Sequence, residues 1–147
     1  MIALASDHGG YDLKMAVIAH LQERELAFKD YGCYDKQSCD YPDFGKAAAL
    51  AIENGECERG IVVCTTGIGI SIAVNRFPAI RCALCTSAHM ARMSREHNDA
   101  NILALGGGIT EDALALEIVD TFLNTPFSNE EKHIRRIKKM SANEQDG

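Results

Sequence analysis

Five short apolar segments alternate with segments of helical periodicity along these 147 residues, and this alternation restricts the possible folds more than any other feature. Uniformly apolar or β-branched runs of this length are typical of strands that are buried on both faces. Strands that alternate with helices predict parallel βαβ units. The expected strands are 2–6, 27–31, 60–64, 80–85 and 101–105. We therefore expect residues 1–147 to form one doubly wound, Rossmann-like α/β/α sandwich with a five-stranded parallel sheet.

The expected strand order is the flavodoxin-like 2-1-3-4-5, in which the first and third strands are neighbours at the switch point. Helices are expected at about 13–24, 42–54, 70–75, 87–96, 110–125 and 129–140. The carboxyl ends of parallel strands lie at one edge of a sheet. This order therefore places Asp7 and His8, which follow the first strand, beside Cys64, which ends the third.

The chain is acidic overall but positive in its middle third. The net charge of −6 argues against general nucleic-acid binding. Between residues 59 and 95 there is no Asp or Glu, whereas five arginines fall inside: Arg59, Arg76, Arg81, Arg92 and Arg95. This distribution favours a small anionic ligand, and the alternative is a set of arginines on the solvated surface.

Membrane and export signals are not expected. No apolar run approaches the ~20 residues that a membrane-spanning helix needs, and the N-terminus lacks the basic flank of a signal peptide. Six cysteines without an export signal indicate reduced thiols and a cytoplasmic location. Cys82 and Cys85 have CxxC spacing, but strand residues three apart face opposite sides of a sheet. A shared metal or a redox pair is therefore disfavoured there.

Residues 60–71 combine a buried strand, a turn with two glycines and the start of a helix. Glycines let a ligand approach the backbone, and free N–H groups at a helix start favour negative charge. Cys64 lies where the strand ends, the usual place for chemistry in open parallel sheets. Our hypothesis is an anionic substrate on which Cys64 acts, and the alternative is a buried core cysteine. A dinucleotide is disfavoured, because no acidic residue ends the next strand.

Other polar residues have both functional and structural interpretations. Thr66 could hydrogen-bond the thiol, the ligand or its own turn, and Asp7 could cap a helix. His97 precedes the fifth strand and Cys64 follows the third, so a strand length of about 16 Å separates them in one chain. If His97 and Cys64 act together, they come from different subunits; otherwise His97 caps its helix. Lys132 and Arg136, four residues apart, share a helical face that could bind phosphate or solvent.

Four segments together resemble the ribose-5-phosphate isomerase B family, whose relatives include allose-6-phosphate and galactose-6-phosphate isomerases. They are residues 6–10, 40–42, 64–71 and 94–101, and the likeness extends from about residue 2 to about residue 140. The resemblance implies an aldose–ketose isomerase of the pentose phosphate pathway that interconverts ribose 5-phosphate and ribulose 5-phosphate through an enediolate. It also implies that no metal or cofactor takes part.

The resemblance also implies roles for single residues. Cys64 is the base that transfers a proton between C1 and C2, and Thr66 is its helper. The backbone that holds the enediolate oxygen is Gly67, Ile68, Gly69, Ile70 and Ser71. His97 opens the sugar ring, with Asp7 assisting. The residues that bind the sugar are His8, Tyr41 and Asn98.

A homodimer or tetramer with shared active sites is a further implication. Lys132 and Arg136 of a neighbouring subunit would hold the phosphate, and the helix at 129–140 would pack on that neighbour. The chain departs from the family where Lys132 replaces a frequent arginine and where Gly108 stands in place of an arginine of many members. The spacing also leaves Arg135 as a substitute for Arg136.

Three alternatives stay open from the sequence. The first is a hexose 6-phosphate such as allose 6-phosphate as substrate, which the pocket size and the loop at 33–43 would decide. The second is a flavodoxin-like binding module without turnover, in which Cys64 and His97 would be replaceable. The third is a thiol redox protein that uses Cys82 and Cys85.

Overall fold

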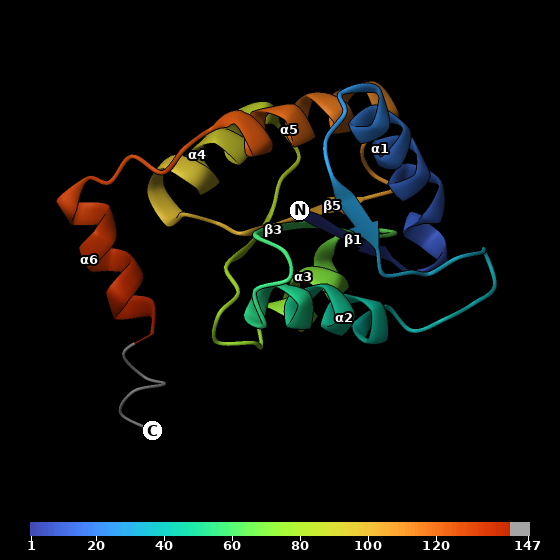
Figure 1. Ribbon diagram of the computed structural model, residues 1–147, viewed down its shortest axis with the longest axis horizontal. Coiled ribbons are helices and arrows are strands. Elements are labelled where there is room, and N and C mark those ends of the chain that lie inside the picture. The colour runs from blue at the N-terminus through green and yellow to red at the C-terminus, as the bar shows by residue number, and fades with distance from the viewer. Residues whose placement is uncertain (142–147) are drawn as a thin grey trace.

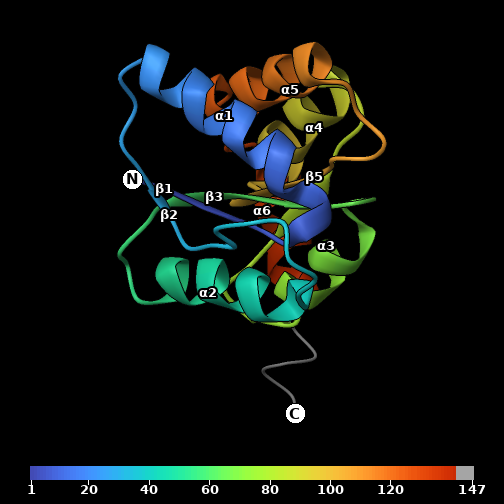
Figure 2. The same cartoon turned by 90° about the vertical axis from the view of Figure 1, so that its right-hand side faces the viewer.

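The computed structural model describes residues 1–141 as three layers around a parallel sheet (Figures 1 and 2). In chain order the elements are β1 (Ile2–Ser6), the short 3-10 helix η1 (His8–Gly10), α1 (Tyr11–Glu23), β2 (Phe28–Asp30), α2 (Tyr41–Glu53), β3 (Arg59–Cys64), α3 (Ile68–Val74), β4 (Cys82–Leu84), α4 (Ala88–Asn98), β5 (Ile102–Gly106), α5 (Asp112–Asn124) and α6 (Glu131–Met140). All neighbouring strands pair in parallel. The expected fold class and the C-terminal helix are confirmed.

The strand order is 2-1-3-5-4, so the predicted order 2-1-3-4-5 is wrong in its last two positions. β5 lies inside the sheet between β3 and β4, and β4 is the edge strand. Every residue of the five-residue β5 is buried, whereas all three residues of β4 are only partly buried. A short, partly exposed strand suits an edge, and a longer, fully buried apolar strand suits the interior.

The sheet separates two hydrophobic cores. Helices α1, α4 and α5 cover one face, and α2 and α3 cover the other (Figure 2). Leu4, Ile61 and Leu103 point into the first core, and Val62 and Cys64 point into the second. Strand residues alternate between faces, so each strand supplies both cores. Cys82 packs on the second core and Cys85 lies in the first, so the prediction that they face opposite sides is confirmed.

The loops at the carboxyl ends of β1, β3 and β5 are joined by backbone hydrogen bonds. The Asp7 amide donates to the Val63 carbonyl at 3.2 Å, and the Gly107 amide donates to the Cys64 carbonyl at 2.8 Å. The Gly108 amide donates to Thr65 at 2.8 Å. Because β5 is the neighbour of β3, its glycine-rich loop, and not that of β4, supports the end of the Cys64 strand.

Helix α6 lies apart from the layers, next to the end of α4 (Figure 1). Its segment is attached through Ser128, whose hydroxyl donates to the Glu96 carbonyl at 2.7 Å. Within residues 1–141, no helix combines the length and hydropathy that membrane crossing requires.

Candidate active site

Cys64 is the last residue of β3, and its thiol lies at the start of α3. The side chain is 4% exposed, and its Sγ accepts a hydrogen bond from the Gly67 amide at 3.1 Å. Gly67 has φ of +80°, a left-handed conformation that turns the chain back towards the sulfur. The Gly67 amide is thus a hydrogen-bond donor directed at the sulfur.

The turn between β3 and α3 uses several of its own polar groups. The Thr66 hydroxyl accepts from the Ile68 amide at 3.2 Å, as expected for ordinary turn chemistry. The Ser71 amide donates to the Gly67 carbonyl at 3.2 Å. Within residues 1–141, the amides of Gly69 and Ile70 donate to no protein acceptor. At the start of α3, these two amides are therefore available to an oxygen atom of a ligand.

A cavity of about 480 Å³ opens beside the thiol. It is lined by Asp7, His8, Tyr41, Cys64, Thr65, Thr66, Ile68 and Gly69. The predicted proximity of Asp7 and His8 to Cys64 is thus confirmed. The Asp7 carboxylate also accepts a hydrogen bond from the Gly10 amide at 3.0 Å. It therefore caps η1, which is the structural role that the sequence analysis gave as its alternative.

The loop between β2 and α2 contacts His8, one of the residues that line this cavity. The His8 Nδ1 accepts from the Cys39 amide at 3.2 Å, which leaves Nε2 to carry the proton of the neutral ring. Tyr41, at the start of α2, lies over Gly69. A Cβ at position 69 would be 2.6 Å from Cζ of the tyrosine, so glycine is required for this contact.

His97 and Asn98 lie at the amino ends of the strands, whereas Cys64 lies at the carboxyl end of β3. They end α4, just before β5 begins, whereas Cys64 pairs with Gly106 at the carboxyl end of β5. The four-residue offset from Ile102 to Gly106 corresponds to about 13 Å. One chain therefore does not bring His97 and Cys64 together.

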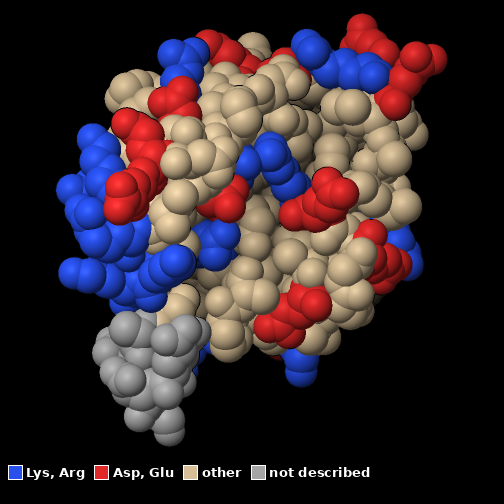
Figure 3. Space-filling model, turned by 60° about the vertical axis from the view of Figure 1, so that its left-hand side comes forward, with Lys and Arg blue, Asp and Glu red and all other residues tan. Residues whose placement is uncertain are grey.

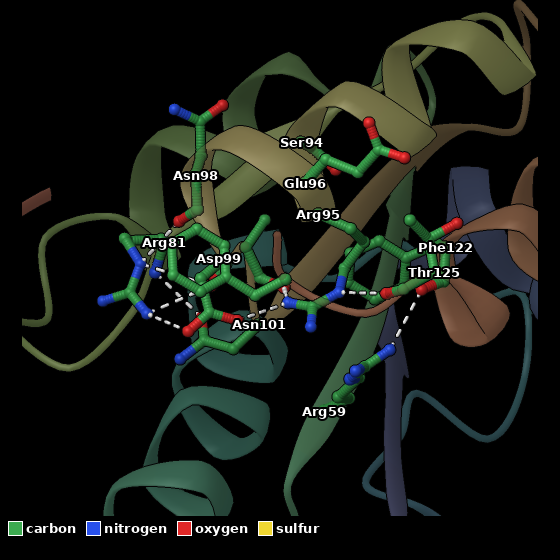
Figure 4. Close-up of polar contacts among 12 residues, drawn as sticks. Arg59, Arg81, Ser94, Arg95, Glu96, Asn98, Asp99, Asn101, Phe122 and Thr125 are labelled. Carbon is green, nitrogen blue, oxygen red and sulfur yellow. Dashed lines mark hydrogen bonds and ion pairs between the residues drawn. The ribbon is translucent and has the colours of Figure 1, made fainter. Parts of the chain in front are cut away.

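Two arginines hold the end of α4 in place, and a third, Arg59, binds the end of α5 (Figure 4). Arg95 donates to the Asp99 carboxylate at 2.8 Å, and Arg81 donates to the Asn98 carbonyl at 2.9 Å. Arg59 donates to the Phe122 carbonyl at 3.0 Å. Arg59, Arg81 and Arg95, three of the arginines of the positive middle third, therefore bind carbonyl groups and one carboxylate. These three arginines bind the protein's own groups, and the anionic ligand expected from the positive middle third stays a prediction.

The side chain of Asn98 points away from this arginine cluster (Figure 4). Its backbone carbonyl accepts from Arg81, and no partner for its amide group is recorded within residues 1–141. The cluster thus fixes the backbone of the helix end and leaves the Asn98 side chain available.

Lys and Arg side chains gather on α6 (Figure 3). The positive charges of Lys132 and Arg136 both act on His133, which places them near the His97 end of α4. Arg135 instead lines a shallow groove with Glu131, Ile134, Lys138 and Lys139. The choice of Arg136 as the partner of Lys132 stays a prediction.

His133 has a role in this region that the sequence did not reveal. Its ring stacks on that of His97 with centroids 4.2 Å apart and an interplanar angle of 18°. The expectation that His97 caps α4 has no support among its contacts, because the helix end is bound by Arg81 and Arg95. Because His97 and His133 are 36 residues apart, no short-range sequence pattern indicates that their rings stack.

The thiols of Cys82 and Cys85 are poorly suited to redox chemistry. Burial raises the pKa of Cys82 well above its ordinary value, and it raises the pKa of Cys85 to about 11. Since the thiolate is the reactive form, a pair that resists deprotonation argues against the thiol redox alternative.

The comparisons with known proteins agree with one another. The model of a family described as Ribose/Galactose Isomerase matches residues 2–140. The chain belongs to the ribose/galactose isomerase family. Ribose-5-phosphate isomerase B of Escherichia coli (strain K12) is 40% identical over 144 residues, which cover 98% of this chain and 96% of the relative. The family resemblance stated from the sequence is confirmed.

Solved structures with similar folds have the same name. A ribose-5-phosphate isomerase B of Clostridium thermocellum superposes with a TM-score of 0.96 at 51% identity, covering 99% of this chain and 97% of that one. The ribose 5-phosphate isomerase of Thermotoga maritima has a TM-score of 0.92 at 47% identity, covering 94% of each chain. Membership in the ribose/galactose isomerase family therefore holds for nearly the whole chain.

Within residues 1–141, no three His, Cys, Asp or Glu side chains gather in an arrangement that could hold a metal ion. The expectation that this member of the isomerase family acts without a metal or cofactor stays a prediction.

Proposed function

We propose that the protein is an aldose–ketose isomerase that interconverts ribose 5-phosphate and ribulose 5-phosphate, as in the pentose phosphate pathway. The relatives named ribose-5-phosphate isomerase B support this substrate. The observation that carries the proposal is the Cys64 thiol, which accepts a hydrogen bond from Gly67 and borders a cavity with Asp7, His8 and Tyr41. Such a thiolate is a base held where a small sugar can reach it.

In the proposed reaction the Cys64 thiolate removes the C2 proton of the open-chain aldose. The electron pair forms the C1–C2 double bond of an enediolate, and the amides of Gly69 and Ile70 stabilise its oxygen. The Cys64 thiol then returns the proton to C1, while a proton leaves O2 and one is added at O1. Thr66, whose hydroxyl accepts from Ile68, has its own proton free to assist this transfer.

We further propose that the second half of the site comes from another copy of the chain. His97, Asn98, Lys132 and Arg136 lie around one end of α4, at the sheet edge opposite to Cys64. A dimer, alone or within a tetramer, would place this group over the partner's Cys64, with α6 packed on the partner. His97 would transfer the protons when the furanose C1–O4 bond breaks, with Asp7 assisting, and Lys132 with Arg136 would hold the phosphate.

The cytoplasm is the proposed location. All six cysteines are free, which suits a reducing compartment.

The test is the conversion of ribose 5-phosphate to ribulose 5-phosphate by the wild type and by Cys64→Ala, without added metal. We expect Cys64→Ala to lower kcat by about 10²-fold or more, because the base is lost. Cys57→Ala is the matched control, since Cys57 is also buried, at 3% exposure, but does not line the cavity.

Equal activity of the wild type and a folded Cys64→Ala would show that Cys64 is not the base. An inactive wild type would lead to allose 6-phosphate as the next substrate. Inactivity on both sugars would favour the binding module.

A further inference from the structure

His133 is the only buried side chain of α6, all ten residues of which the structure describes. It is 5% exposed and lies against His97, with the two rings nearly parallel. The other polar attachment between this segment and α4 is backbone-directed, from Ser128 to the Glu96 carbonyl. The imidazole stack is therefore the one side-chain contact recorded between α6 and the ring that we assign to sugar-ring opening.

Hydrogen bonding does not account for the presence of a histidine at position 133. Its Nε2 is buried and has no hydrogen-bond partner among the described residues, although a Glu130 carboxylate oxygen lies 3.3 Å away. A buried polar atom without a partner costs free energy, so a fully apolar ring would be more stable at this position. The contact that the His133 ring makes with His97 is through its flat face.

Burial and the charges around His133 both favour the neutral form of its ring. Burial lowers its pKa, and the neighbouring His97, Lys132 and Arg136 lower it further, against the opposing effect of Glu130. A neutral ring can lie against a protonated one without charge repulsion. In its neutral form His133 therefore adds no positive charge beside His97.

We propose that His133 is a positioning residue for His97. Its ring, held by α6, fixes the plane of the His97 imidazole, so that the acid is aimed at the furanose ring oxygen when a sugar phosphate binds. Lys132 is adjacent to His133 in the sequence and Arg136 is three residues further on, so the helix that binds the phosphate also orients the acid. The inference rests on the proposed function, because it needs His97 to open the sugar ring.

The test compares His133→Ala, which removes the stack, with His133→Phe, which keeps a flat ring and removes only the nitrogens. His89→Ala is the matched control, because His89 is an exposed histidine at the other end of α4. Each variant is assayed with ribose 5-phosphate and, in the reverse direction, with ribulose 5-phosphate. The ketose cannot close a furanose ring because its O5 carries the phosphate, so its consumption does not begin with ring opening.

We expect His133→Ala to lower kcat for ribose 5-phosphate about tenfold more than for ribulose 5-phosphate, because a misplaced acid affects ring opening. His133→Phe should stay within about twofold of the wild type in both directions, since ring stacking is retained. Thermal unfolding of each variant establishes that it is folded, and His89→Ala should match the wild type.

Several results would overturn the inference. A rise in KM for both sugars, with equal loss of kcat, would mean that His133 only docks α6. A folded His133→Phe as impaired as His133→Ala would mean that the nitrogens act, and an unimpaired His133→Ala would mean that the stack has no role. Failure of the proposed function gives a different pattern: a wild type inactive with both sugars, or a His97→Ala that is fully active on ribose 5-phosphate.

Discussion

At the scale of single residues, the candidate site depends on atoms that approach very closely. Tyr41 lies over Gly69, and both residues line the cavity beside Cys64. A methyl group at position 69 cannot fit without moving the tyrosine ring, because a Cβ there would be 2.6 Å from Cζ. The tyrosine and the glycine therefore form one unit of the sugar site, although they come from different helices.

Gly69→Ala should raise KM for ribose 5-phosphate about fivefold or more by displacing Tyr41, with a smaller effect on the unfolding midpoint. Steady-state kinetics of the single and double variants tests this. If the methyl group acts through the tyrosine, then Gly69→Ala combined with Tyr41→Ala should be no worse than Tyr41→Ala alone. Fully additive losses would show that the alanine harms the site by another route.

At the scale of elements, a buried lysine connects α1 to the strand and loop beyond it. Lys14 is 0% exposed, and its Nζ lies 2.8 Å from the Asp30 carboxylate at the end of β2. It also donates to the Cys33 carbonyl, in the loop that leads to Tyr41. Lys14 thus connects α1 to the end of β2 and to the loop that leads to Tyr41, which lines the cavity.

Lys14→Met should lower the free energy of unfolding by about 3 kcal/mol, because it leaves Asp30 and the Cys33 carbonyl without their buried partner. Denaturant unfolding measures this. Lys29→Met is the matched control. The Lys29 Nζ also lies close to a carboxylate, 2.9 Å from that of Glu56, but both of these side chains are exposed. Lys29→Met should leave the midpoint almost unchanged. Similar losses in both variants would contradict the structural role given to Lys14.

At the scale of the whole molecule, the two groups of candidate residues lie at opposite edges of one sheet. Cys64 and Asp7 follow the carboxyl ends of β3 and β1, whereas His97 and the basic face of α6 lie where β5 begins. Parallel strands enforce this separation, because every helix that follows a strand returns the chain to the other edge. Two copies are required to complete one proposed site.

Mixing two inactive variants tests this arrangement. Cys64→Ala and His97→Ala should each be nearly inactive alone, but subunit exchange should restore about a quarter of the wild-type activity. Half of the randomly mixed dimers contain both variants, and each of these has one intact site of two. Crosslinking the subunits of each variant before mixing should prevent the recovery. No recovery after proven subunit exchange would place both residues in sites within one chain.

The sequence determined the fold class, and it indicated the Cys64 half of the site. Alternating apolar and helical segments dictate a parallel α/β sheet, and the strand, glycine turn and helix at 60–71 are local features that short-range patterns report. Tertiary packing decided what depends on contacts between distant segments. It put β5 inside and β4 at the edge, because a five-residue apolar strand gains more from burial on both faces than a three-residue one. It bound Arg59, Arg81 and Arg95 to carbonyl groups, and it stacked His133 on His97.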